Sequence, residues 1–181
     1  MQQWQVICNG IAASSSLTKL ELDVVVYPED QEHDGPVYVE VCAKLAGLTN
    51  LNALCMADSC LVPGDALALT ALTGLTRLEL KGTGAGVGDL AATAIASSCQ
   101  QLRHLDLSSC ELGSMVCLAV VRSLTQLTEL QLEGNSGLTQ QGLMLLTGLK
   151  QLRYLGVTKN LEVTHQVLQR FWRAVLQLPQ W

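Results

Sequence analysis

Aromatic residues and charges are scarce in this sequence. Of its 181 residues only 4% are aromatic and 15% are charged, and the formal net charge is −5. A protein that binds nucleic acid usually presents a basic balance or a basic face, so we expect no nucleic-acid partner. Because aromatic side chains are few, the core must be aliphatic, and about one residue in five is leucine. The length suits a single domain over 1–181 with a sizeable core.

Signals for export or membrane insertion are also missing. The first residues, MQQWQVICNGIAASSS, contain no basic cluster and no long apolar run, unlike a signal peptide. No stretch reaches the length of a membrane-spanning helix, and no N-x-S/T glycosylation site occurs. We therefore expect a soluble, cytoplasmic protein without a membrane partner, with association with the cytoskeleton and a nuclear location as open alternatives.

The cysteines do not form a metal-binding or disulfide pattern. There are seven of them, no C-x-x-C pair occurs, and the sequence has only three histidines. A structural zinc site uses closely spaced ligand pairs, and a secreted disulfide framework uses an even number of cysteines. The sequence predicts reduced thiols that pack as small hydrophobic side chains in a reducing compartment, and no metal or cofactor.

What the sequence does contain is a repeated pattern, L-x-x-L-x-L. Copies such as LTRLEL at 75–80 and LRHLDL at 102–107 recur along most of the chain. The second leucine of each copy is Leu20, Leu54, Leu78, Leu105, Leu130 and Leu155. Successive separations are 34, 24, 27, 25 and 25 residues, and all but the first lie within the range typical of leucine-rich repeats.

Each copy continues into a turn and then into a helical segment. One position of the turn carries a side chain that can satisfy backbone groups, and a column of such residues forms a ladder. The ladder positions are Ser59, Thr83, Cys110, Asn135 and Asn160. Apolar spacings of three and four predict helical segments over 65–75, 89–99, 114–124, 139–149 and 164–176, with Asp89, Thr139 and Thr164 as N-caps. Together the elements predict an α/β solenoid of about six repeats, a right-handed curved superhelix with parallel strands on its concave face.

The ends of the chain differ from the repeats. All three tryptophans and the single phenylalanine lie in the terminal segments, and large aromatic side chains cover the exposed ends of a solenoid core efficiently. We expect a C-terminal capping helix within 164–181 that stops at Pro179. Residues 2–13 are typical of the helical half of a preceding repeat, so the chain either begins with a helical cap or belongs to a longer solenoid.

Two segments depart from the regular pattern. The insertion YPEDQEHDGP at 27–36 accounts for the long first interval, and we interpret it as an acidic loop that could also contact a partner. The stretch KGTGAGVGD at 81–89 is rich in glycine, but its spacing fits neither G-x-G-x-x-G nor the P-loop pattern. It predicts an extended turn rather than a phosphate site.

The stretch SSCQQLRHLDLSSCEL at 97–112 resembles the cysteine-containing leucine-rich repeat of F-box proteins and their relatives. The units that follow Leu132 resemble the Asn-type repeats of ribonuclease-inhibitor-like proteins. This resemblance extends over about 15–178 and implies a solenoid that binds proteins, but members of these families bind many unrelated partners. No F-box motif occurs in the sequence, so any ubiquitin-ligase adaptor module that the resemblance implies would lie elsewhere.

Strand alternation predicts which side chains line the concave face. With the leucines inward, the residues between and beside them face outward. A middle column holds Glu21, Cys55, Glu79, Asp106, Gln131 and Gly156, and one flank holds Lys19, Ala53, Arg77, His104, Glu129 and Tyr154. We expect the partner to contact Glu21, Arg77, Glu79, Lys81, His104, Asp106, Ser108, Glu129, Gln131, Glu133 and Tyr154. Four of these acids are nearly contiguous, which favours a basic or polar protein surface as partner.

An enzymatic interpretation rests on one repeat, in which His104, Asp106, Ser108 and Cys110 lie close together in sequence. Catalysis requires a nucleophile within hydrogen-bond reach of the histidine, in a pocket that excludes water, and a shallow solenoid face rarely provides one. We therefore predict a monomeric, non-enzymatic scaffold that binds a partner protein through its concave face. The open alternatives are the substrate-recognition part of an SCF-type (F-box/LRR) ubiquitin ligase, a ribonuclease-inhibitor-like scaffold, a cytoskeletal or axonemal component and, last, a hydrolase that uses His104.

Overall fold

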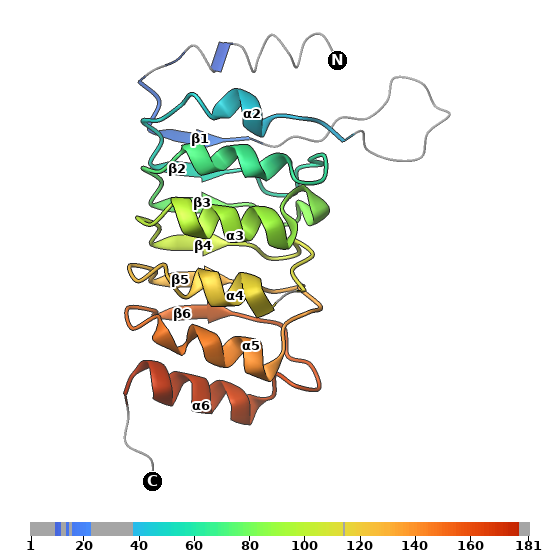
Figure 1. Ribbon diagram of the computed structural model, residues 1–181, viewed down its shortest axis with the longest axis vertical. Coiled ribbons are helices and arrows are strands. Elements are labelled where there is room, and N and C mark those ends of the chain that lie inside the picture. The colour runs from blue at the N-terminus through green and yellow to red at the C-terminus, as the bar shows by residue number, and fades with distance from the viewer. Residues whose placement is uncertain (1–9, 12–13, 15, 23–37, 114, 178–181) are drawn as a thin grey trace, which may run out of the picture.

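The computed structural model describes residues 10–11, 14, 16–22, 38–113 and 115–177, which include one sheet of six parallel strands. The strands lie in chain order across the sheet (Figure 1). They are β1 (Lys19–Glu21), β2 (Ala53–Cys55), β3 (Arg77–Glu79), β4 (His104–Asp106), β5 (Glu129–Gln131) and β6 (Tyr154–Gly156). The register places the key leucines opposite one another, from Leu20 beside Leu54 to Leu130 beside Leu155. The predicted solenoid and its repeat alignment are confirmed.

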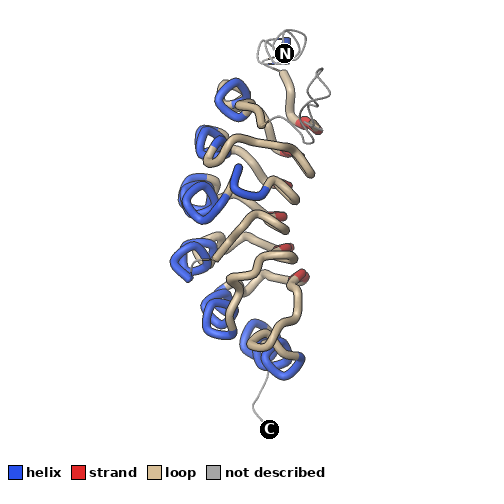
Figure 2. The backbone as a smooth tube through the Cα atoms, turned by 90° about the vertical axis from the view of Figure 1, so that its right-hand side faces the viewer, coloured by secondary structure: helices blue, strands red, loops and turns tan. Residues whose placement is uncertain are grey.

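Helical segments form a second layer. They are α2 (Cys42–Leu45), η1 (Asp65–Ala71), η2 (Gly84–Gly86), α3 (Gly88–Ser98), α4 (Met115–Val121), α5 (Gln140–Leu145), η3 (Leu146–Gly148) and α6 (His165–Val175), where η denotes a 3₁₀ helix. Figure 2 shows the longer helices along the outer, convex side and the strands along the inner, concave side. The strands therefore lie on the concave face, as predicted.

The helical segments are shorter and more varied than the sequence spacing suggests. The segment predicted at 65–75 is a 3₁₀ helix over Asp65–Ala71 only, whereas α3 is a regular α-helix of 11 residues. Leu54 and Leu78 are separated by 24 residues, the shortest interval, while Leu78 and Leu105 are separated by 27. A 3₁₀ helix rises about 2.0 Å per residue and an α-helix about 1.5 Å, so a tighter helix covers the return path with fewer residues.

Two of the three predicted N-caps are confirmed. The Thr139 hydroxyl accepts the N–H of Gly142 at 3.0 Å, and the Thr164 hydroxyl accepts the N–H of Val167 at 3.4 Å. The prediction for Asp89 is wrong, because α3 begins one residue earlier and Asp89 lies in its first turn. Its carboxylate instead accepts the backbone N–H of Gly113 from the next repeat, at 3.2 and 3.3 Å.

Leucine side chains fill the space between the two layers. The key leucines of the inner strands, such as Leu54 and Leu105, are 1% exposed or less, whereas Leu20 and Leu155 in the outermost strands are only partly buried. Burying one leucine is worth about 1.5–3 kcal/mol. Because the end strands have a neighbouring repeat on one side only, stacking of repeats supplies the burial that a single repeat cannot.

The turn ladder predicted from the sequence is present. The Asn135 side-chain oxygen accepts the N–H groups of Cys110 at 3.1 Å and Leu112 at 3.0 Å, and its amide nitrogen donates to the carbonyl of Leu107 at 2.8 Å. The Cys110 thiol donates to the Leu80 carbonyl at 3.0 Å. The ladder side chains of Cys110, Asn135 and Asn160 thus satisfy backbone groups of their own and the preceding repeat. The Thr83 hydroxyl instead donates to the Leu80 carbonyl of its own repeat.

Amphipathic helix α6 closes the C-terminal end of the described core. Phe171 is fully buried, and Trp172 packs edge-on against it with ring centroids 5.3 Å apart. The helix ends at Val175 rather than at Pro179, and Gln177 has a left-handed φ of 56° just beyond it. The expectations for 27–36, for most of 2–13 and for Trp181 lie outside the described residues. None of the described helices is long and apolar enough to cross a membrane.

Candidate functional site

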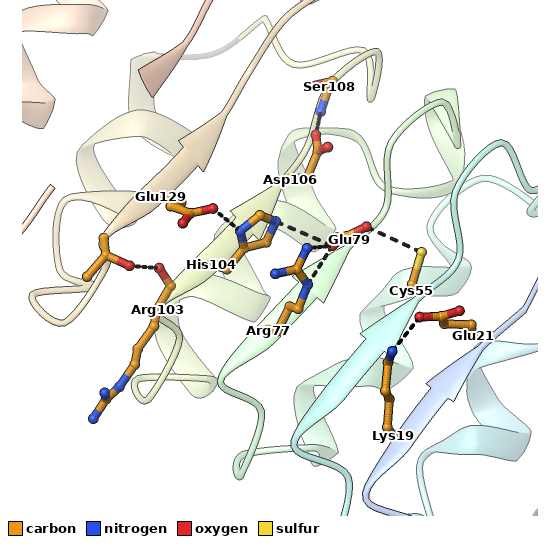
Figure 3. Close-up of polar contacts among 11 residues, drawn as sticks. Lys19, Glu21, Cys55, Arg77, Glu79, Arg103, His104, Asp106, Ser108 and Glu129 are labelled. Carbon is orange, nitrogen blue, oxygen red and sulfur yellow. Dashed lines mark hydrogen bonds and ion pairs between the residues drawn. The ribbon is translucent and has the colours of Figure 1, made fainter. Parts of the chain in front are cut away.

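The concave face holds the side chains that the repeat alignment predicted there. The register sets Lys19, Ala53 and Arg77 side by side across β1–β3. It likewise sets His104, Glu129 and Tyr154 side by side across β4–β6. Figure 3 shows how the side chains of the first four strands contact one another along this face.

Ion pairs within strands dominate the first part of the face. Lys19 Nζ lies 2.7 Å from Glu21 Oε1 on β1, and both side chains are about two-thirds exposed, at 67% and 64%. On β3 the Arg77 guanidinium pairs with the Glu79 carboxylate, whose Oε1 accepts the Nε–H at 2.6 Å. Between these strands the Cys55 thiol donates to Glu79 Oε2 at 3.4 Å.

The Glu79 carboxyl is the most connected acid on the concave face. Burial alone would raise its pKa, but hydrogen bonds from Arg77 and Cys55, together with the charges of Arg77 and His104, hold the pKa below its ordinary value. Glu79 is therefore an ionised, internally compensated acid at neutral pH. It offers a partner less uncompensated charge than the sequence suggested.

His104 connects β3 to β5. Its Nδ1 lies 2.7 Å from Glu129 Oε2, and its Nε2 lies 3.5 Å from Glu79 Oε1, which is too far and too poorly aligned for a hydrogen bond. The residue is only 8% exposed. His104 thus holds the Glu129 carboxylate and presents little surface of its own.

Asp106 and Ser108 are also largely covered, at 5% and 2% exposed. The Asp106 carboxylate accepts the backbone N–H of Ser108 at 2.9 Å. The Ser108 hydroxyl has no hydrogen-bond partner among the described residues. Since His104 is bonded to Glu129, these residues do not form the acid–histidine–serine chain that a hydrolase requires.

The accessible part of the predicted contact set lies around these buried residues. Exposed members are Glu21, Arg77, Lys81, Glu129, Glu133 and Tyr154, and Glu79 and Gln131 are half-buried. Three acids of the predicted contiguous run have partners within the protein, because Glu79 pairs with Arg77, Glu129 is hydrogen-bonded to His104 and Asp106 caps a turn. Gly156 adds no side chain and is covered by Glu133, because a Cβ at this position would come within 3.3 Å of the Glu133 Cδ.

A hollow of about 310 Å³ lies on the concave face over the first three strands. We call it the β1–β3 hollow, and its side chains are those of Lys19, Glu21, Ala53, Cys55, Arg77 and Glu79. Lys19, Ala53 and Cys55 were placed in the concave columns by the sequence but not among the expected contacts. The sequence signal for this hollow is that β2 has small outward side chains, whereas the outward side chains of β1 and β3 are long and charged.

The described cysteines are free thiols, and burial makes several of them poor nucleophiles. Burial raises the pKa of Cys99, Cys110 and Cys117 to about 11, and burial also raises the pKa of Cys55. Because the thiolate is the reactive form, these groups are inert near neutral pH. Among the described residues, no cluster of three or more His, Cys, Asp or Glu is arranged to hold a metal ion.

The glycine-rich turn at 81–89 uses its amide groups internally. Backbone N–H groups of this turn donate to backbone carbonyls of the next repeat. That of Gly82 donates to the Ser108 carbonyl at 2.8 Å, that of Gly84 to the Ser109 carbonyl at 3.1 Å, and that of Gly88 to the Cys110 carbonyl at 3.2 Å. A phosphate-binding loop needs such amides free to point at the ligand. A side chain at Gly86 would come within 2.6 Å of the Leu61 Cβ, so this glycine permits close packing of neighbouring turns.

No protein-family model matches this sequence, and no curated protein is similar enough to match it. Solved structures do match its fold. An internalin from Listeria monocytogenes is 19% identical with a TM-score of 0.62, and the similarity covers 94% of this chain and 49% of that one. This chain therefore spans about half the length of the internalin structure.

The tropomodulin C-terminal domain from Caenorhabditis elegans is 14% identical with a TM-score of 0.53, over 94% of this chain and 90% of that one. At such identities the likeness concerns the fold. It agrees with the leucine-rich repeat solenoid, whereas the cysteine-containing and ribonuclease-inhibitor-like subtypes stay predictions.

Proposed function

We propose that this chain is a non-enzymatic scaffold that binds a partner protein through the concave face of its sheet. The observation that supports this most is the separation of roles between the two faces of each strand. Inward leucines build the core, while outward side chains such as Arg77, Glu129 and Tyr154 stay accessible without any backbone role. A surface of ordered, exposed, mixed charges is suited to selecting a protein partner.

The polar geometry supports binding over catalysis. His104, the centre of the enzymatic alternative, is held between two carboxylates and has no bond to a nucleophile among the described residues. The concave hollow is open to solvent and is lined by ion pairs, so it does not isolate a reacting group from water.

Two more specific roles are compatible with this proposal. Substrate recognition for an SCF-type ubiquitin ligase follows from the sequence resemblance, and it requires an adaptor module that this sequence does not contain. A cytoskeletal or axonemal role is the second, and the fold shared with a tropomodulin domain is compatible with it. We propose that the binding unit is a monomer in the cytoplasm in either case.

The test uses the full chain as bait for affinity capture, followed by binding measurements with the purified captured protein. Glu129→Gln with Glu133→Gln removes two exposed carboxylates from the concave face, whereas the buried His104 and Asp106 stay intact. We expect at least a tenfold loss of affinity, because the partner loses charge complementarity. We expect only a small fall in melting temperature, because the glutamine of Glu129→Gln keeps an oxygen that can accept from the buried His104 Nδ1.

The matched control carries Gln141→Lys and Gln166→Lys, which change the net charge equally on exposed helix positions of α5 and α6. We expect it to bind like the wild type. Equal loss in both variants would indicate a nonspecific charge effect, and loss in the control alone would place binding on the convex side and refute the proposal.

A further inference from the structure

The β1–β3 hollow exists because β2 carries small side chains between strands with long ones. Ala53 lies in register between Lys19 and Arg77, and Cys55 lies in register between Glu21 and Glu79. Neighbouring strands are about 4.8 Å apart, so the long side chains on either side stand about 10 Å apart across a shallow floor. The methyl group of Ala53 is the apolar part of that floor, while the Cys55 thiol is hydrogen-bonded to Glu79 of the neighbouring wall at 3.4 Å.

The two walls of the hollow carry their charges in the same order along the strand. Each wall is an ion pair within one strand, with its basic residue two positions before its acidic residue. Because β1 and β3 are both parallel to β2, the two basic residues stand at one end of the hollow and the two acidic residues at the other. Figure 3 shows the β1 pair on one side of Cys55 and the β3 pair on the other.

The Lys19–Glu21 ion pair retains hydrogen-bonding groups that a partner could use. The Lys19 ammonium has three donors, of which Glu21 takes one, and the β1 pair has no further contact among the described side chains. The hollow volume of about 310 Å³ lies at the lower end of the range for pockets that hold a whole small ligand. Its open form on a curved face is better matched to a protruding side chain of a partner than to a cofactor.

We propose that the β1–β3 hollow receives a segment of a partner protein with a defined polarity. The segment places an apolar side chain over Ala53, an acidic group toward Lys19 and Arg77, and a basic group toward the exposed Glu21. This proposal rests on the proposed function, since it names the chemistry that one part of the concave face recognises. Charge order then selects the orientation of the partner segment, and the apolar side chain supplies the buried contact.

The experiment selects binders from a random-peptide display library on the full-length wild-type protein. Selection is made against background on Ala53→Trp, which fills the hollow from an outward-facing position. We expect the enriched peptides to carry an apolar residue flanked by one acidic and one basic residue. Amide hydrogen exchange should show protection in β1–β3 when a selected peptide binds.

Polarity is tested with the double swap Lys19→Glu with Glu21→Lys. This variant keeps the net charge and the ion pair on β1 but reverses its direction, and both side chains are exposed enough that the fold is unaffected. We expect the selected peptides to bind the swap at least tenfold more weakly. Gln166→Lys, an exposed change on α6 away from the concave face, should bind them like the wild type.

The outcomes separate this inference from the proposed function. Selected peptides that protect β4–β6 and bind the swap unchanged would overturn the hollow and leave the concave scaffold standing. Peptides that protect α3 and α5 instead would overturn both. Failure to enrich any peptide over the Ala53→Trp background would also overturn the hollow as a recognition site.

Discussion

The turn ladder and the concave face use similar polar side chains for different purposes. In the ladder, Asn135 bonds to backbone groups of neighbouring turns and is buried. On the concave face, Arg77 and Glu129 bond to other side chains and remain accessible. Backbone partners recur in each repeat, whereas side-chain partners vary with the sequence. The ladder therefore carries stability common to all repeats, and the concave face carries what is specific to this protein.

The largest loss of folding stability is expected from a substitution in the leucine core, which supports both the ladder and the concave face. Leu105→Ala removes a side chain that is 1% exposed at the centre of β4, and it should destabilise the protein by about 2–5 kcal/mol through lost burial and a cavity. Denaturant unfolding measures this. Ser109→Ala, an exposed turn position four residues later, is the control and should change stability by less than about 0.5 kcal/mol. Equal effects would contradict the repeat alignment.

The next largest loss of stability is expected from a substitution in the turn ladder. Asn135→Ala leaves the N–H groups of Cys110 and Leu112 and the carbonyl of Leu107 without their partner, and a buried unsatisfied group costs about 1–3 kcal/mol. Urea unfolding should show a loss in this range. Asn135→Asp keeps the accepting oxygen but sets its second oxygen against the carbonyls of Leu107 and Leu132, so it should not recover the loss. If Asn135→Ala were as stable as the wild type, the ladder would not be the source of turn stability.

The two confirmed helix caps provide a finer comparison. Thr139→Ala removes an N-cap with a hydrogen bond of 3.0 Å and should cost about 1 kcal/mol. Thr164→Ala removes a longer bond of 3.4 Å, and we expect a smaller loss in the same thermal unfolding measurement. The reverse order would show that α6 depends on its cap more than on the burial of Phe171.

The smallest effect is expected on the concave face and depends on pH. The folded-state pKa of Glu79 is lowered, so the stability that its ionised form contributes is present above the unfolded-state pKa and is lost as pH falls through the folded-state value. Glu79→Gln should lower the melting temperature slightly near neutral pH and by less in acid. A melting-temperature series over pH tests this, and a difference that grew in acid would contradict the lowered pKa.

Much of the fold follows from spacing alone. The positions of six leucines predicted the six strands and their register, because leucine periodicity decides which residues can be buried together. Spacing could not predict that 65–71 is a 3₁₀ helix, which depends on the path length left by a short repeat. Nor could it place the start of α3, where Asp89 bonds to the next repeat instead of capping its own helix.

The candidate site was predictable in outline and not in detail. Strand alternation identified the columns of the concave face, but accessibility depends on neighbours from other repeats. Glu79 pairs with Arg77 and Glu129 is hydrogen-bonded to His104 from the adjacent strand, so two acids of the apparent free run have partners within the protein. The β1–β3 hollow likewise arises only when β2 is set between its two neighbours.

The sequence by itself determined the repeat, the direction in which each leucine points and the ladder of turn residues, since these depend on order along one chain. The tertiary structure decided which concave side chains pair, which stay exposed and where small residues leave a hollow. The physical reason is distance. Residues about 25 positions apart become neighbours about 4.8 Å apart only when the repeats stack, and charge and shape on the face depend on those neighbours.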